Sequence, residues 1–273
     1  FSPTVQDYCY NSIMLIKLGI PLALIVLGII SGMWVNYLAD VLPWKRRLAK
    51  PFCPSCETVQ PLVNYFIAPR RCPNCTAPRS WRTWVVELVY IGLAIWTFEH
   101  PASKLDFWLG WLILVYFGIV VVIDLEHRLI LHPVSWAGAA LGAIIGLIRN
   151  GWLDTLLGGV IGFGVMWLLY QLGEAIMKGL ARLRDRTADD IALGFGDVNL
   201  SGVLGLILGW QLILWGLVLT ALIGGLISLI YLIVMLILRR YRLFTALPYG
   251  PYLVLGAFIL LFFGEYLLTT LGY

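Results

Sequence analysis

The chain has 273 residues, of which 60% are hydrophobic and only 12% are charged, and its mean hydropathy is +0.88. A soluble domain carries about a quarter charged residues, so this composition excludes a water-soluble globular protein. The formal net charge of +4 follows from an uneven distribution of Lys and Arg among the loops, and it does not indicate nucleic-acid binding.

Apolar segments follow one another along the whole chain and do not alternate with polar residues, which predicts helices and excludes a β-barrel. We expect an all-α polytopic membrane protein with about eight transmembrane helices. The sixth and seventh segments form one apolar run of about forty residues, too long for one span, and we divide it at Gly209-Trp210-Gln211. No secretory signal peptide is evident, so the first segment is expected to be a retained anchor. The predicted spans are 18–40, 84–99, 107–123, 133–149, 152–176, 194–210, 211–238 and 249–270.

The longest segment between predicted helices, 43–83, holds four of the five cysteines. They form two CxxC motifs that are separated by fifteen residues. Each CxxC turn directs two sulfurs toward one point, and two such turns supply the tetrahedral shell of a structural zinc ion. Reduced or redox-active thiols are the alternative. The predicted zinc ligands are Cys53, Cys56, Cys72 and Cys75.

Two aspartates stand at the ends of apolar runs, where an ionisable side chain is costly and suggests a function. Asp124 ends one run and Asp197 closes Gly194-Phe195-Gly196-Asp197. Taken singly, each is explained as a helix-end residue near lipid headgroups or a helix N-terminus. Together they predict an aspartic dyad, in which one carboxylate activates water and the protonated one polarises a peptide carbonyl. Gly194 and Gly196, which lack a Cβ, are predicted to let a substrate backbone approach.

Lys and Arg are concentrated in the segments expected on one side of the membrane. Sixteen of the 19 fall in 43–83, 124–132, 177–190 and 239–248. The positive-inside rule makes these segments cytoplasmic, with both aspartates at the cytoplasmic face and both termini outside. We interpret 177–190 either as an amphipathic helix on the membrane surface or as a solvated basic loop.

The two aspartates also allow a second interpretation. Asp124 and Asp197 could instead couple ions in a transporter or channel with a zinc regulatory domain, but such sites lie near the middle of the membrane in repeated halves. Both aspartates fall at one boundary and no repeat is evident, which favours the protease.

The glycine-rich runs 158–164 and Gly224-Gly225 predict close helix packing rather than a phosphate-binding loop.

The order and spacing of these motifs resemble the type IV prepilin leader peptidases, which are polytopic aspartic proteases with a GxGD motif. The resemblance covers nearly the whole chain. It rests on Gly28, Gly32 and Asn36 followed by Pro43, on the paired CxxC motifs, on Glu87, on Asp124, on Gly194–Val198, and on Pro248-Tyr249-Gly250-Pro251.

The resemblance implies an enzyme of the bacterial inner membrane that cleaves the basic leader of prepilins or pseudopilins at the cytoplasmic face, beside membrane lipid. These substrates are expected to carry a basic leader and a hydrophobic helix. Family members with the cysteine insert often also methylate the new N-terminal amine with S-adenosylmethionine. Glu87 is then expected to serve the methyl-transfer site or the cytoplasmic module. A peptidase without methyltransferase activity is the alternative. The implied organisation is a first helix in 1–42, a zinc module in 43–83 and a seven-helix catalytic core in 84–273.

This chain departs from the family pattern beside the predicted dyad. Asn199 stands where the family usually has Lys, two residues after the GxGD aspartate. His132 precedes a proline that comes later than is common, and Val134 replaces the usual Asp after it. We expect His132 to be a headgroup or capping residue rather than a metal ligand. These departures bear on substrate range more than on the reaction class.

Overall fold

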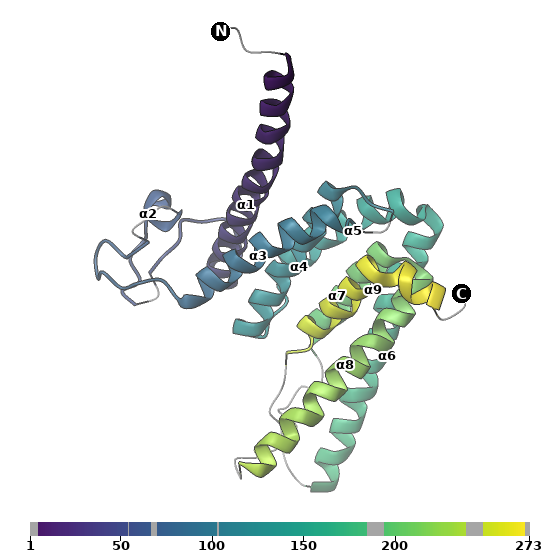
Figure 1. Ribbon diagram of the computed structural model, residues 1–273. Coiled ribbons are helices and arrows are strands. Elements are labelled where there is room, and N and C mark those ends of the chain that lie inside the picture. The colour runs from purple at the N-terminus through teal and green to yellow at the C-terminus, as the bar shows by residue number, and fades with distance from the viewer. Residues whose placement is uncertain are drawn as a thin grey trace. The chain divides into compact units, whose positions relative to one another are not determined.

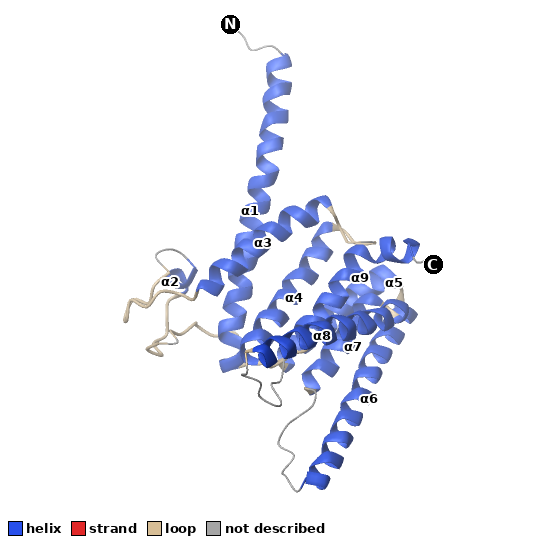
Figure 2. Cartoon of the chain, turned by 60° about the horizontal axis from the view of Figure 1, so that its bottom comes forward, coloured by secondary structure: helices blue, strands red, loops and turns tan. Residues whose placement is uncertain are grey.

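The computed structural model describes residues 5–53, 55–66, 70–102, 104–184, 194–238 and 248–270, with side chains from residue 19 to 179 and from 194 to 264 within these ranges (Figure 1). Over these residues the chain is helical, and its only extended pairing is two isolated β-bridges in the cysteine segment (Figure 2). The helices are α1 (Val5–Lys45), α2 (Leu62–Phe66), α3 (Trp81–Glu99), α4 (Phe107–His127), α5 (His132–Asn150), α6 (Trp152–Arg184), α7 (Phe195–Leu208), α8 (Trp210–Ile237) and α9 (Gly250–Thr270).

Each of the eight predicted segments is a helix in the structure. The predicted break in the long apolar run is confirmed, because α7 ends at Leu208 and α8 begins at Trp210. Gly209 between them has a φ of 81°, a left-handed conformation that glycine adopts without strain. Three boundaries are wrong by five residues or more, since α1 extends beyond 18–40 at both ends and α6 continues to Arg184.

The continuation of α6 also bears on segment 177–190. Its first part, 177–184, is neither a loop nor a separate surface helix, because it belongs to α6. The rest of that segment, 185–190, lies outside the described residues, as does nearly all of the basic segment 239–248.

Among the described residues, four helices are long and apolar enough to cross a membrane. They are Gly19–Lys45, Phe107–His127, Trp152–Gly179 and Trp210–Ile237, and two shorter apolar helices are Phe195–Leu208 and Gly250–Gly264. The protein is therefore a helical membrane protein, as its composition predicts.

The chain divides into two compact units, and we describe each separately. The first unit comprises residues 1–101 and 110–115, and the second comprises 102–109 and 116–273. In the first unit α1 packs against α3 in antiparallel fashion. A Cβ on Gly28 would lie 2.6 Å from the Cα of Ile91, and a Cβ on Gly32 would lie 2.8 Å from the Cα of Glu87. These two glycines therefore allow the backbones to approach closely.

In the second unit α7 is the central helix, and it contacts α5, α6, α8 and α9 (Figure 2). The contact with α6 depends on glycine, because a Cβ on Gly158 would meet the carbonyl oxygen of Gly205. One turn further along α6, Ser201 donates a hydrogen bond to the carbonyl of Gly162 at 2.8 Å. The predicted close packing is thus confirmed at Gly158 and Gly162. It is wrong at Gly164 and Gly225, where a Cβ would have nothing within 4 Å.

Candidate active site and metal centre

The two aspartates of the predicted dyad both lie in the second unit, at helix ends. Asp124 is in the last turn of α4 and Asp197 is in the first turn of α7. Both are buried, with 4% and 8% of their surface exposed. They lie near enough for the charge of Asp124 to act on Asp197. The structure therefore brings together the two carboxylates that the sequence predicts as partners.

The end of α4 explains how the chain reaches α7. Arg128 adopts a left-handed conformation with a φ of 52°, and its N–H donates to the carbonyl of Asp124 at 2.8 Å, which ends the helix. The chain then passes Ile130 before α5 begins. A Cβ on Gly196 would lie 2.8 Å from the Cβ of Ile130. The room predicted at Gly196 for a substrate backbone is thus taken by Ile130, whereas Gly194 faces the Oδ2 of Asp197, 3.3 Å from where its Cβ would be.

A third helix end completes the surroundings of the dyad. α9 begins at Gly250, whose N–H donates to the Oδ2 of Asp124 at 3.0 Å. A Cβ on Gly250 would lie 2.6 Å from the same oxygen, so any other residue there would displace the Asp124 carboxylate. Tyr249 is close enough to be affected by the charge of Asp197. The sequence motif predicts the start of a helix here, but not this hydrogen bond with Asp124.

The geometry fits proton-sharing chemistry. Two buried carboxylates in reach of one another cannot both ionise cheaply, so one of them can hold a proton while the other acts as a base. The hydrogen bond from Gly250 fixes the orientation of the Asp124 carboxylate. Such a pair can activate water on one side and polarise a carbonyl on the other.

The four predicted zinc ligands converge in the first unit. Their Sγ atoms all lie within 4.8 Å of one another, and this is the one such cluster of potential ligands that the described residues contain. Cys53 and Cys75 are 3.6 Å apart, as are Cys56 and Cys72. A tetrahedral zinc ion with Zn–S bonds of about 2.3 Å would place its sulfurs roughly 3.8 Å apart. The donor set therefore fits zinc.

The two CxxC turns have the same backbone geometry. The N–H of Cys53 donates to Thr58 at 2.9 Å, and that of Cys72 donates to Ala77 at 3.1 Å. The residue after the second cysteine of each motif, Glu57 and Thr76, has a φ of 55° and 54°. Each turn is thereby closed into a loop that presents both sulfurs inward, which is why the motif spacing predicts the cluster.

The thiols hold their protons unevenly. Hydrogen bonds from the backbone of Cys75 and then Asn74 lower the pKa of Cys72 to about 6, despite the opposing effect of burial. The backbone N–H of Ala77 lowers the pKa of Cys75, but burial and the neighbouring thiols outweigh it and raise the pKa to about 12. Four thiols this close compete for negative charge, and a divalent cation relieves that competition.

Glu87 is buried in an ion pair with the cysteine segment. The Nη1 of Arg70 lies 2.9 Å from both carboxylate oxygens of Glu87, and the Arg70 guanidinium stacks 4.8 Å above the ring of Trp84. Glu87 is only 6% exposed, so its carboxylate does not face solvent. Sequence reasoning missed Arg70, because nothing in a basic loop distinguishes one arginine from its neighbours.

A second ion-pair network joins the cysteine segment to α1 and α3. Asp40 accepts hydrogen bonds from Arg79 at 2.8 Å, from Arg82 at 2.5 Å and from the hydroxyl of Tyr65 at 2.5 Å. Burial and then the charge of Asp40 raise the pKa of Tyr65, so its hydroxyl remains a donor. Nearby, Asn36 donates to the carbonyl of Thr83 at 3.2 Å.

Known proteins show the same two-part pattern. The type IV leader peptidase family matches residues 109–229, which include both aspartates, and the bacterial peptidase A24 N-terminal domain matches residues 26–100, which include the four cysteines. The chain belongs to the type IV leader peptidase family.

Curated proteins that are similar to this chain carry the name prepilin leader peptidase/N-methyltransferase. That of Pseudomonas aeruginosa is 26% identical over 93% of this chain and 93% of its own length. Those of Aeromonas hydrophila and Legionella pneumophila are both 27% identical, over 83% and 90% of this chain and 76% and 86% of their own lengths. No solved structure matches the chain.

Proposed function

We propose that this protein cleaves the leader peptide of type IV prepilins or pseudopilins with Asp124 and Asp197 as its catalytic residues. The observation that carries the proposal is that two buried carboxylates, at the ends of α4 and α7, lie near enough for the charge of one to act on the other, within the part that matches the family. The reaction class follows from family membership, and the residue roles are inferred from this geometry.

In the proposed mechanism a water molecule binds between the two carboxyl groups. The ionised aspartate takes a proton from the water, and the protonated aspartate donates a hydrogen bond to the scissile carbonyl. The resulting hydroxyl oxygen bonds to the carbonyl carbon, and the tetrahedral intermediate then expels the amine, which takes a proton from the dyad. The roles of Asp124 and Asp197 as acid and base can exchange between steps.

We further propose that the eight predicted segments each span the inner membrane, with both termini outside and the dyad at the cytoplasmic face. The basis is the bias of Lys and Arg toward one set of loops. The segment 43–83 is then a cytoplasmic zinc module with Cys53, Cys56, Cys72 and Cys75 as ligands, between a first helix in 1–42 and a catalytic core in 84–273. Reducing conditions there keep the thiols available for metal.

The relatives' names support a second activity, methylation of the new N-terminus with S-adenosylmethionine. We assign Glu87 to that methyl-transfer site. The buried side-chain oxygens of Asn36 and Thr83 have no hydrogen-bond partner among the described residues, and Thr83 lies one turn from Glu87 on α3. Polar groups of this kind fit a polar cofactor, which when bound supplies the methyl group. A peptidase without this activity is the alternative.

A transporter function is disfavoured by the position of the aspartates. Both lie within one turn of a helix end, whereas coupling sites in transporters lie near the middle of the membrane at interrupted helices.

Incubation of the purified protein with a prepilin and labelled S-adenosylmethionine tests both activities, because the product mass reports cleavage and methylation together. Asp124→Asn and Asp197→Asn should each abolish cleavage and leave membrane insertion intact. Asp106→Asn is a matched control, since Asp106 is an exposed carboxylate at the other end of α4 that makes no capping hydrogen bond. Full cleavage by Asp124→Asn would refute the proposal.

A further inference from the structure

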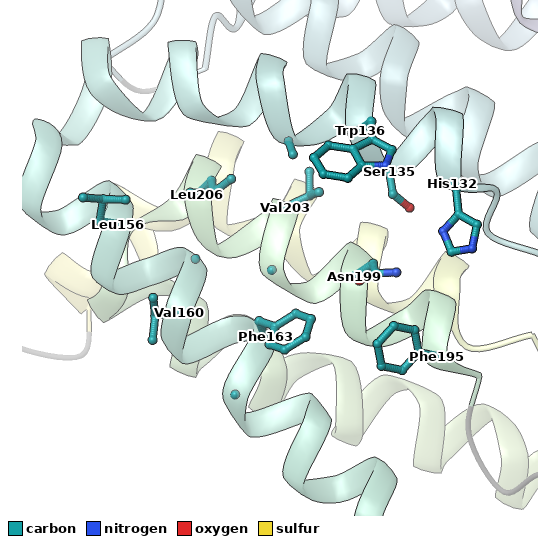
Figure 3. A pocket seen from close by; sticks show the side chains of 14 residues that line it. His132, Ser135, Trp136, Leu156, Val160, Phe163, Phe195, Asn199, Val203 and Leu206 are labelled. Atoms are coloured by element: carbon teal, nitrogen blue, oxygen red, sulfur yellow. The ribbon is translucent and has the colours of Figure 1, made fainter.

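A groove of about 650 Å³ runs along α7 between α5 and α6, within the second unit (Figure 3). Apolar side chains and glycines from the three helices make up most of its lining, which includes Trp136, Val160 and Phe163. Its three polar lining residues, His132, Ser135 and Asn199, lie toward one end, as Figure 3 shows. The groove therefore has an apolar length and a polar end.

One group at the polar end points to a ligand. Ser135 is only 9% exposed, and its hydroxyl has no hydrogen-bond partner among the described residues. A buried hydroxyl without a partner is unfavourable, and a polar group in the groove would satisfy it. The first turn of α5 supplies His132 and Ser135, and the second turn of α7 supplies Asn199. Two of these three residues, His132 and Asn199, are positions where this chain departs from the family pattern.

The polar end of the groove and the dyad lie on two sides of the N-terminal end of α7. Asn199 follows Asp197 by two residues, which corresponds to about 200° of rotation and 3 Å of rise, so the two side chains emerge on opposite sides of the same helix. A helix is about 10 Å across, and three or four extended residues span that distance. A polypeptide in the groove can thus reach the dyad by passing the N-terminal end of α7 in extended form, as a scissile segment must be.

We propose that this groove binds the apolar helix of the substrate, which lies on the C-terminal side of the scissile bond. In this arrangement His132, Ser135 and Asn199 bind the polar groups at the start of that helix. The proposal rests on the proposed function. An apolar helix lying in a groove makes contacts at every third or fourth residue, which suits walls formed by three helices. A lipid acyl chain is the competing occupant, but an acyl chain has no polar groups and would leave the hydroxyl of Ser135 without a hydrogen-bond partner.

The first test fills the groove. Gly164 lines it and a Cβ there would have nothing within 4 Å, so Gly164→Leu adds an apolar side chain without a backbone clash. Gly225→Leu on α8 is the matched control, because Gly225 is equally open and lies outside the groove. We expect Gly164→Leu to lower kcat/KM for a full-length prepilin by roughly 10- to 100-fold. Gly164→Leu should cleave a short peptide that ends a few residues after the scissile bond at the wild-type rate. Gly225→Leu should cleave both the full-length prepilin and the short peptide at the wild-type rate.

The second test identifies the occupant directly. A photoreactive benzoylphenylalanine in place of Val160, in an Asp197→Asn background that retains the substrate, should crosslink to the apolar helix of the prepilin. The same probe in place of Leu226, an exposed residue of α8, should not. Crosslinks from position 160 to lipid alone, or full activity of Gly164→Leu on the long substrate, would overturn the groove proposal while leaving the peptidase proposal intact. A wild-type protein that cleaves neither substrate would instead defeat the proposed function.

Discussion

Substitution of Gly250 by alanine tests the surroundings of the dyad with a single methyl group. In most helical positions this change is stabilising by up to about 1 kcal/mol. Here the new Cβ would lie 2.6 Å from the Oδ2 of Asp124, well inside van der Waals contact, which begins near 3.4 Å. The carboxylate must therefore move by roughly 0.8 Å, and a misplacement of about 1 Å in an active site costs on the order of 100-fold in rate. We expect kcat to fall by about that factor, equivalent to about 2.7 kcal/mol of transition-state stabilisation.

The assay is cleavage of a purified prepilin in detergent, with thermal unfolding measured on the same samples. Gly225→Ala on α8 is the matched control, because its Cβ would have nothing within 4 Å. It should cleave at the wild-type rate and unfold at the same temperature or slightly higher. An unchanged kcat in Gly250→Ala, with the protein folded, would show that the contact between Asp124 and the start of α9 has no role in catalysis. A lowered unfolding temperature with a proportionate loss of activity would instead indicate damage to the fold.

Three further predictions concern the rest of the molecule. Cys72→Ser should reduce bound zinc from one ion per chain to near zero by metal analysis and should lower methylation more than cleavage; an unchanged zinc content would contradict the metal site. Glu87→Leu should destabilise the first unit by roughly 3–5 kcal/mol, because it leaves the buried Arg70 without its partner, whereas addition of Arg70→Met should restore most of that loss. Methylation that returns in the double variant would mean that Glu87 acts through the ion pair, and methylation still absent would mean that it acts directly. Gly158→Ala should lower the free energy of unfolding by about 1–3 kcal/mol because its Cβ meets the backbone of α7, while Gly179→Ala, at an open position of the same helix, should not.

The helices could be predicted because their signals are local. Apolar runs give eight helices, and the length of the sixth and seventh runs together requires a break that the backbone makes at Gly209. The ends of α1 and α6 could not be predicted from hydropathy, because both helices continue into polar sequence. Helical hydrogen bonding does not stop where apolar composition stops, so a span and a helix need not share boundaries.

The candidate sites were predictable only in part, for a related reason. Asp124, Asp197 and the four cysteines are recognisable because the residue type is unusual for its place or because the spacing is the one that a zinc site requires. Their partners are ordinary residues that become specific only through contacts distant in sequence. Arg70 is one of several arginines in its segment, yet its Nη1 donates to both carboxylate oxygens of Glu87. Gly250 is one of 28 glycines, yet its N–H holds the carboxylate of Asp124.

The glycines at both sites have one property in common. At three of them, a Cβ added to the glycine would lie less than 3 Å from an atom of a neighbouring residue. These glycines are Gly250 beside Asp124, Gly196 beside Ile130, and Gly32 beside Glu87. None of the three has a positive φ, since among the described glycines only Gly151 and Gly209 do. Conformational freedom therefore does not explain them, and the absence of a side chain does. The glycine before Asp197 is best understood as a packing requirement that lets the loop after α4 close against α7, and the same requirement at the start of α9 places a backbone donor on the other aspartate.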